Sequence, residues 1–303
     1  MIQKSLSSRA WAELFLLGCI WGGSFLSIRL ALDHMGPLTT VLHRTFWGML
    51  VLWAVVLWRG HPIPRGKGLW RAFFVMGLLN NVIPFTLMAW GQQFIGTGLT
   101  SIFNATTAVF AVLLGAMVFA DERLTRRKLV GVGLGFAGVI IAIGPKALVH
   151  LDATSLAQLA VVTGAISYAC AGVWARRALT GVAPEVAAAG MLTGSSIVMV
   201  PLVLLTEGVP VLALPSQAWI AVGYVAIVAT AFAYLLFYRV LAVAGSANLM
   251  LVTLIIPPIA IVLGAWVRAE TLPAQAFLGF VFLALGLVVL DGRLVNRLTY
   301  TAR

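Results

Sequence analysis

Long apolar stretches, separated by short polar segments, organise the chain from end to end. A helix needs about 20 apolar residues to cross a bilayer, and ten stretches approach or exceed that length. They lie at about residues 11–32, 37–58, 70–90, 95–119, 128–144, 156–178, 184–206, 217–238, 245–267 and 273–290. The pattern predicts ten transmembrane helices, joined by loops too short to form a further domain.

The composition agrees with a protein whose solvent is mostly lipid. Hydrophobic residues make up 61% of the 303 residues and charged residues only 10%, and the mean hydropathy is +1.04. A soluble core of this size does not need so many apolar residues. The two cysteines, Cys19 and Cys170, lie within apolar stretches and lack the spacing of metal ligands. We therefore expect them to be packing residues.

The basic residues predict how the chain is oriented. With ten spans, sixteen of the twenty Lys and Arg residues fall on one side, three fall on the other, and Arg44 lies inside a span. Because basic residues accumulate on the cytoplasmic side, both termini are expected in the cytoplasm of a multi-pass protein of a bacterial inner membrane. The net charge of +11 therefore reflects topology, and no nucleic-acid partner is expected.

One segment of the chain occurs twice. Residues 112–124 read VLLGAMVFADERL and residues 261–272 read IVLGAWVRAETL, and each copy is followed by two glycines seven residues apart. The sequence thus predicts two halves, residues 1–147 and 148–303. Five spans per half means that the second half enters from the opposite side. The predicted fold is an all-α integral membrane protein, a five-plus-five inverted repeat around a central cavity.

Two motifs carry a resemblance to a known family. The residues TrpGlyGlySerPhe at 21–25 and the repeated LeuGly…Glu…Leu…Gly pattern resemble the EamA family of the drug/metabolite transporter (DMT) superfamily, and within it the YddG-type amino-acid exporters. The resemblance implies a cavity lined by the first, third, fourth, sixth, eighth and ninth spans, with the fifth and tenth outside. The chain departs from the pattern in its fourth span, because Thr107-Ala108 stand where the ninth span has Pro257-Pro258.

Polar groups inside the spans are the first candidates for substrate binding, because they are costly in lipid. Asn80 and Asn81 lie halfway along the third span, one turn before Pro84. They either bind the polar end of a substrate or satisfy the carbonyl that the proline frees. Ser101 and Asn104 are spaced i, i+3 and share a face of the fourth span. Ser24, in the first span, completes this polar set.

Aromatic residues predict the apolar wall of the cavity. Trp21 and Tyr168 occupy equivalent positions in the repeat, and Trp174 and Tyr234 lie in the sixth and eighth spans. Each one alone is equally well explained by packing or by contact with lipid. As a set they suit a cavity that holds a bulky apolar side chain.

Four further residues are candidates for gating or for binding a carboxylate. Arg44 lies seven residues inside the second span, where it either binds a substrate carboxylate or extends its charge toward the membrane surface. His43 is its neighbour. Gln92, between the third and fourth spans, is either a gate or part of a hydrated loop, and Pro257 is a candidate hinge.

The positions of the acidic residues argue against several functions. All nine fall in loops or near the ends of spans, so no carboxylate at the midplane relays a proton or binds sodium. The chain has no Walker A, HExxH or GxSxG motif. We therefore expect no catalytic residue, metal site or cofactor, and no enzyme.

These observations predict a secondary, non-ATP transporter that exports small metabolites, above all neutral and aromatic amino acids. It is expected to work by alternating access, to be facilitative and to function as a monomer in the bilayer. One alternative is an exporter of hydrophobic drugs or other metabolites, with or without proton coupling. That alternative predicts competition by lipophilic cations and indifference to Asn80, Asn81 and Asn104. An intramembrane enzyme and a non-transporting scaffold are the other two alternatives.

Overall fold

The fold was analysed in a computed structural model. It describes residues 8–122, 124–144, 152–244, 249 and 252–291. Across these residues the secondary structure is helical, with no strand.

The part of the chain before residue 145 forms five predicted spans, of which two are composite. Their helices are α1 (Ser8–Ala31), α2 (Pro37–Trp58), α3 (Lys67–Gly77), the π-helix η1 (Leu78–Val82), α4 (Ile83–Gly91), α5 (Thr97–Ala105), α6 (Thr107–Val118) and α7 (Arg126–Ile143). The segments α3, η1 and α4 form one continuous third span. A break at Thr106 separates α5 from α6 within the fourth.

The rest of the chain has a similar order of helices. It contains α9 (Ala153–Ala178), α10 (Pro184–Thr206), α11 (Ser216–Gly223), the π-helix η2 (Tyr224–Phe232), α12 (Ala233–Ala244), α14 (Val252–Arg268) and α15 (Ala274–Asp291). A π-helical segment therefore occurs in the third span and again in the eighth. Pro37 and Pro184 begin α2 and α10, as expected at a position where the missing N–H is not needed.

The lengths and composition of these helices make this a multi-pass membrane protein. Eight helical stretches of the described chain are long and apolar enough to cross a bilayer, and three of these combine consecutive labelled elements (67–91, 97–118 and 216–240). The helix α14 is a shorter apolar helix of 17 residues. The remaining long helix, α7, has 18 residues and starts with three basic ones. An all-helical membrane fold was predicted; the ten-span count stays a prediction.

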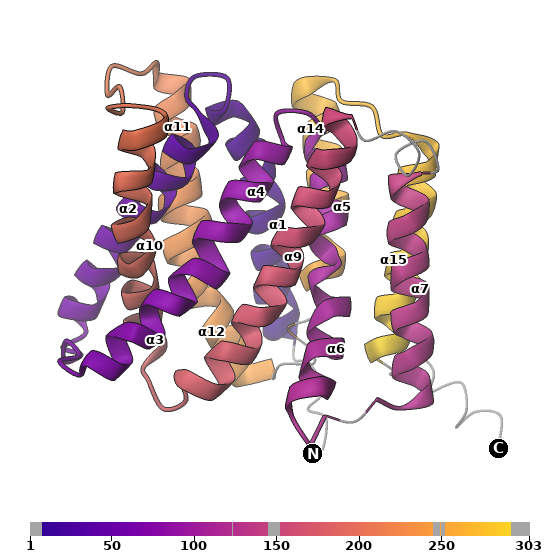
Figure 1. Ribbon diagram of the computed structural model, residues 1–303, viewed down its shortest axis with the longest axis horizontal. Coiled ribbons are helices and arrows are strands. Elements are labelled where there is room, and N and C mark those ends of the chain that lie inside the picture. Colours follow the sequence, from indigo (N-terminus) through magenta and orange to yellow (C-terminus); the bar gives the residue numbers. More distant parts are fainter. Residues whose placement is uncertain (1–7, 123, 145–151, 245–248, 250–251, 292–303) are drawn as a thin grey trace.

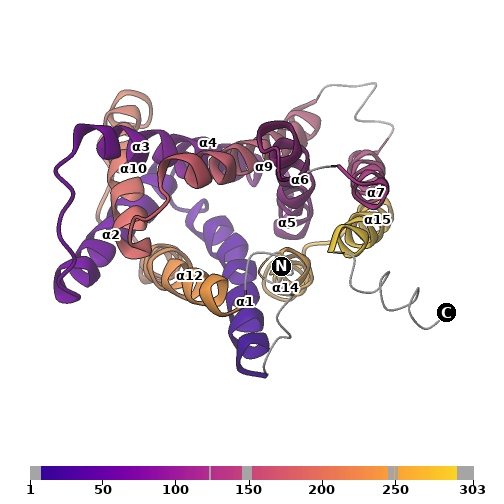
Figure 2. The same ribbon diagram turned by 90° about the horizontal axis from the view of Figure 1, so that it is seen from below.

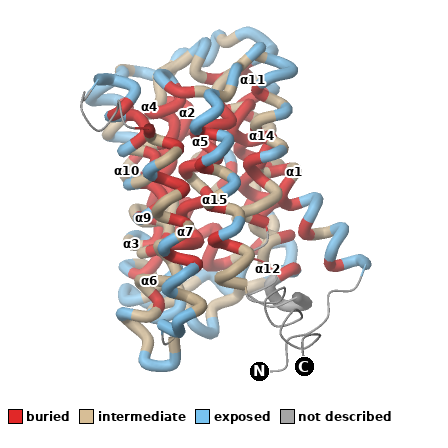
Figure 3. Tube along the Cα trace, turned by 90° about the vertical axis from the view of Figure 1, so that its right-hand side faces the viewer, coloured by how far each residue is buried: buried red, intermediate tan, exposed pale blue. Residues whose placement is uncertain are grey.

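The helices form a bundle of two layers with one pair beside it. Figure 2 shows α3, α10, α4, α9 and α6 across one layer, α2, α12, α1 and α14 across the other, and α7 with α15 at the edge. In Figure 1 the lower end is where α1 begins and α2 ends, and the upper end is where α1 ends and α2 begins. Buried segments line the inner faces of the helices in Figure 3, and exposed ones gather on the connections and outer faces.

Glutamates between helices cap helix N-termini elsewhere in the bundle. Glu207, after α10, accepts hydrogen bonds from the backbone N–H groups of Leu38 (3.0 Å) and Thr39 (2.8 Å) at the start of α2. Glu270, after α14, accepts from the backbone N–H and the hydroxyl of Thr97 at the start of α5, at 2.7 and 2.8 Å. A carboxylate is favourable there because the first N–H groups of a helix lack intrahelical partners. These contacts join helices more than 160 residues apart in sequence.

Glycines allow α7 and α15 to pack backbone against backbone. A Cβ atom added at Gly138 would lie 2.6 Å from the carbonyl oxygen of Gly279, and one at Gly279 would lie 2.5 Å from the carbonyl oxygen of Gly138. Gly131 and Gly286 are related in the same reciprocal way, at 2.9 and 2.7 Å. Small residues are the usual means of close helix contact in a membrane. These are the glycines that follow the two copies of the duplicated segment.

This geometry predicts opposite effects for two alanine substitutions in α7. Gly138→Ala should lower the stability of the protein by about 1–3 kcal/mol, because the added methyl overlaps backbone that cannot move without separating the helices. Gly133→Ala, where a Cβ meets nothing within 4 Å, should leave stability unchanged or raise it by up to about 1 kcal/mol. Thermal unfolding of the two purified variants in detergent checks the difference. Equal effects would contradict the close packing.

Candidate functional site

Two asparagines of η1 form the centre of a buried polar cluster. Asn81 has no exposed surface and donates from Nδ2 to the Ser195 hydroxyl at 2.9 Å. The Tyr234 hydroxyl donates to Asn81 Oδ1 at 3.2 Å and accepts from Asn80 Nδ2 at 3.1 Å. We call Asn80, Asn81, Ser195 and Tyr234 the amide cluster. It joins the third span to α10 and α12, two helices of the later part of the chain.

Hydroxyl groups of neighbouring helices bind the backbone around η1. Ser167 of α9 donates to the Leu79 carbonyl at 2.7 Å, and Ser195 of α10 lies 3.2 Å from the Gly77 carbonyl. A π-helical turn interrupts the regular hydrogen bonds of the helix, and such turns are frequent at functional sites. The recorded bonds of Asn80 and Asn81 reach side chains, not the carbonyl one turn before Pro84. The amide groups of Asn80 and Asn81 therefore do not serve to satisfy the carbonyl that Pro84 frees.

Arg44 is a buried cation beside this cluster. Only 9% of the residue is exposed. Its Nε donates to the Thr230 hydroxyl at 3.0 Å, and its guanidinium carbon lies 3.6 Å from the centre of the Phe85 ring. Tyr168 meets the same Phe85 ring edge-on, with ring centroids 6.2 Å apart. The guanidinium thus contacts residues of α4 and η2, and its partner Thr230 lies four residues before Tyr234 of the amide cluster.

The charge of Arg44 has no counter-ion among the described residues. No ion pair includes it, and its recorded hydrogen bond is the one to Thr230. A buried charge is costly unless it is paired, and a desolvated cation–π contact returns only about 2 kcal/mol. A guanidinium in these surroundings can bind an anionic group.

The other predicted gating residues lie in well-packed surroundings. His43 accepts from the Trp47 indole at 3.0 Å, and its ring meets that of Trp219 with centroids 5.6 Å apart. Gln92 is 1% exposed and donates to the Phe25 carbonyl of α1 at 3.0 Å, so it is not part of a hydrated loop. Pro257 is buried within α14.

Several of the predicted lining residues use their polar atoms on the backbone. The indole of Trp21 donates to the Ala229 carbonyl in η2 at 3.2 Å, and that of Trp174 donates to the Ala72 carbonyl at 3.1 Å. Ser24 and Ser101 bond to their own helices. Asn104 differs, because its Oδ1 is buried and has no hydrogen-bond partner in the described structure.

Sequence reasoning missed three residues that complete the Arg44 and Asn81 contacts. Ser195, Thr230 and Phe85 lie in apolar stretches and were not singled out. The Ser195-Ser196 pair in the middle of the seventh span is a signal that was available, since two adjacent hydroxyls in lipid are costly. Nothing in the sequence marks Phe85 as the ring that meets Arg44.

Ion pairs join helix ends at both ends of the bundle. At the upper end, Arg268, the last residue of α14, contacts Asp33 after α1 at 2.6 Å, and Arg29 reaches the same carboxylate at 3.4 Å. At the lower end, Arg176 of α9 contacts Asp121 at 2.6 Å and Glu122 at 2.5 Å, both after α6. The hydrogen bond from Arg176 lowers the pKa of the Asp121 carboxyl below its ordinary value. This carboxylate therefore stays charged at neutral pH.

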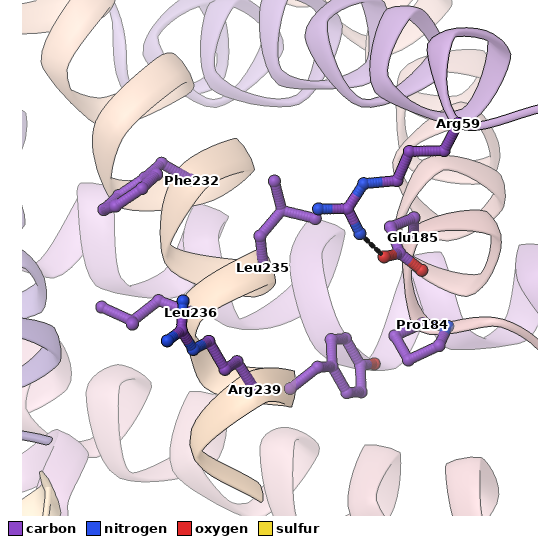
Figure 4. Close-up of a pocket in the computed structure, with 8 residues that line it drawn as sticks. Arg59, Pro184, Glu185, Phe232, Leu235, Leu236 and Arg239 are labelled. Carbon is purple, nitrogen blue, oxygen red and sulfur yellow. Dashed lines mark hydrogen bonds and ion pairs between the residues drawn. The ribbon is translucent and has the colours of Figure 1, made fainter. Parts of the chain in front are cut away.

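Two cavities lie toward the ends of the bundle. One, of about 460 Å³, is drawn in Figure 4 between α2, α10 and α12 at the lower end, where Arg59 pairs with Glu185. The other, of about 280 Å³, lies between α1 and α11 at the upper end. Neither is lined by Arg44 or by the amide cluster. The buried polar site thus lies apart from both.

Comparison with known proteins gives the chain a family. The EamA-like transporter family matches residues 10–144 and again residues 155–290. The "Uncharacterized inner membrane transporter YedA" of Escherichia coli (strain K12) is 26% identical over 280 residues, covering 92% of this chain and 88% of that protein.

Two relatives carry names that mention amino acids. The "Probable terminal-alkyne amino-acid exporter" of Streptantibioticus cattleyicolor is 29% identical and covers 96% of both chains. The "Probable amino-acid metabolite efflux pump" of Salmonella typhimurium is 25% identical and covers 90% of this chain and 92% of its own. A solved crystal structure is similar to this chain with a TM-score of 0.69 at 18% identity, covering 96% of this chain and 99% of that one. That likeness concerns the fold alone.

The amide cluster predicts a specific effect of removing one hydroxyl. Tyr234→Phe should destabilise the protein by about 1–3 kcal/mol, because Asn81 then loses a donor inside an environment without water. Tyr238→Phe, one turn further along α12 and outside the cluster, should have a smaller effect. Unfolding temperatures of both variants in the same detergent give the comparison. A loss at Tyr238 as large as that at Tyr234 would count against the cluster.

Proposed function

The chain belongs to the EamA-like transporter family, and from this premise we propose that it exports small metabolites, above all neutral and aromatic amino acids, by alternating access. The coarser part, a multi-pass membrane transporter of a small molecule, rests on the family and on the apolar helices. The finer part is carried by one observation: a buried, unpaired Arg44 beside the amide cluster.

The chemistry of this site suits an amino acid. The Arg44 guanidinium can bind a carboxylate through two parallel N–H groups. The amides of Asn80 and Asn81 supply further donors and acceptors. Phe85 and Tyr168, whose ring centroids are 6.2 Å apart, offer apolar surface for a side chain. The names of the Streptantibioticus and Salmonella relatives support the same substrate class.

The helix contacts support two halves that move against each other. We propose residues 1–147 and 148–303 as these halves, with both termini in the cytoplasm. In such a repeat, α1 corresponds to α9, and α5 with α6 corresponds to α14. The packing of α1 on α14 then has its counterpart in the packing of α9 on α5 and α6, and both contacts occur. The contacts of α2 with α10 and of α7 with α15 each join two helices that occupy equivalent positions in the proposed halves. Rocking of two such halves exposes a central site to each side in turn.

The charges favour facilitated movement. All nine carboxylates of the sequence lie in loops or near the ends of spans, so none is placed beside Arg44 to carry a proton. Transport would then follow the substrate gradient. The chain is proposed to work as a monomer.

Counterflow in proteoliposomes tests the proposed function. Vesicles preloaded with unlabelled phenylalanine should take up labelled phenylalanine faster than empty vesicles, and a pH gradient should not change the rate. Folded protein that exchanges no neutral or aromatic amino acid would overturn the amino-acid proposal. Inhibition by lipophilic cations would then favour the alternative, an exporter of hydrophobic drugs.

The ion pair at the upper end yields a second prediction. Asp33→Arg or Arg268→Asp alone should slow exchange several-fold, because like charges then oppose each closure of α1 against α14. The double variant, with the charges exchanged, should return exchange to within about twofold of the starting protein. Rates of phenylalanine counterflow for the three variants measure this. A double variant as slow as either single one would exclude a closing role for the pair.

A further inference from the structure

We propose that this transporter selects the carboxylate and not the ammonium group of its substrate, so that monoanionic carboxylates (2-hydroxy acids and N-acylated amino acids) are exported through the same site, driven by the membrane potential. The proposal rests on the proposed function, transport through the Arg44 site, and names the charge of what that site takes.

The first step concerns what can receive a carboxylate. The Nε atom of Arg44 donates to the Thr230 hydroxyl, and the guanidinium lies over the Phe85 ring. Within the described structure its two terminal nitrogens have no acceptor. Tyr168 meets the same Phe85 ring edge-on, with ring centroids 6.2 Å apart. Its hydroxyl has no recorded hydrogen bond in the part of the chain that the structure describes. A guanidinium and a free hydroxyl around one ring are suitable donors for the two oxygens of a carboxylate.

The second step concerns what can receive an ammonium. An ammonium group has three donors and a charge, and burying it in a low-dielectric site is costly where no anionic partner is present. Among the nine carboxylates, the one deepest in a helix is Glu13, and it is held near the lower end by Arg9 and Arg239 at 3.2 and 2.9 Å. The amide cluster offers only neutral oxygens, and Asn81 Oδ1 already accepts from Tyr234. The site therefore has partners for the carboxylate of the substrate and no anionic partner for its ammonium group.

The third step is the charge balance of the occupied site. A monoanion brings the buried charge at Arg44 to zero, whereas a zwitterion leaves it at plus one. Burying a net charge is unfavourable, so a 2-hydroxy acid should bind at least as well as the amino acid with the same side chain. A cation that keeps the ammonium and lacks the carboxylate should be excluded.

The fourth step is the consequence for energetics. When a site exposes itself to each side in turn, the substrate's net charge crosses the membrane field. The field is worth about a 50-fold concentration ratio per 100 mV for one charge. The negative interior of a cell then drives a monoanion outward without a coupled proton. A zwitterion carries no net charge and does not respond.

Three probes that share one side chain separate these possibilities. They are phenylalanine (zwitterion), 3-phenyllactate (monoanion) and phenylalaninol (cation at neutral pH). In proteoliposomes, 3-phenyllactate should inhibit phenylalanine counterflow at equal or lower concentration, and phenylalaninol should require at least tenfold more. Under a potassium diffusion potential, labelled 3-phenyllactate should accumulate several-fold on the positive side, and phenylalanine should not.

Two substitutions link the effect to Arg44. Arg44→Gln should weaken the binding of 3-phenyllactate to the purified protein, measured by calorimetry in detergent, at least tenfold while leaving that of phenylalaninol unchanged or stronger, a reversal that a structural defect would not produce. Arg65→Gln removes the same charge from an exposed loop and should change the binding of neither probe. If Arg44→Gln does not fold, Arg44→Lys should retain the preference for the anion, and the measurements on the unmodified protein stand alone.

The outcomes distinguish this proposal from the one on which it rests. Phenylalanine exchange without inhibition by 3-phenyllactate, or 3-phenyllactate transport that ignores the potential, would overturn the carboxylate-only selection and leave amino-acid export standing. Exchange of 3-phenyllactate without phenylalanine would support it and remove amino acids from the substrate class. Exchange of neither probe by folded protein would overturn both.

Discussion

The exclusion of water from the bilayer core governs the interior of this protein. A polar group that loses its partner there cannot turn to solvent, so it must bond within the bundle. The two π-helical segments show how this is done. Ser167 bonds the Leu79 carbonyl of η1 and Trp21 bonds the Ala229 carbonyl of η2, each from a helix more than 85 residues away. Irregular turns that would be open to water in a soluble protein here determine which helices lie together.

The same exclusion of water makes the charge of Arg44 costly. A guanidinium at a protein surface is balanced by water and salt, but this one has a hydroxyl, an aromatic face and no carboxylate among the described residues. The protein bears a free-energy penalty that packing does not explain. An anionic ligand would remove it, and the amide cluster beside it gives that ligand polar neighbours. The stability of the protein and its proposed function are therefore opposed at this residue.

Much of this arrangement was readable from the sequence. Prolines marked the starts of α2 and α10, and Asn80, Asn81 and Arg44 stood out because polar groups in a span are rare. The π-helical turns were not readable, because they depend on contacts with other helices. Nor was the helix that Glu270 caps, because its carboxylate lies near the start of α15 in the sequence and bonds Thr97 of α5 in the structure. Partners separated by 150 residues are fixed by three-dimensional packing, which hydrophobic patterns in one dimension do not contain.

The contact between α7 and α15 has a consequence for assembly. Gly138 faces the backbone of Gly279 and Gly279 faces that of Gly138, and Gly131 and Gly286 repeat the exchange. Gly131 and Gly279 are the first glycines after the two copies of the duplicated segment, and Gly138 and Gly286 are the second. The first glycine of each copy therefore meets the second of the other, which is the pattern of an isologous interface. Such an interface does not require that its two sides belong to one polypeptide. Two separate chains of five helices, inserted in opposite orientations, would have in these four glycines a ready surface for association.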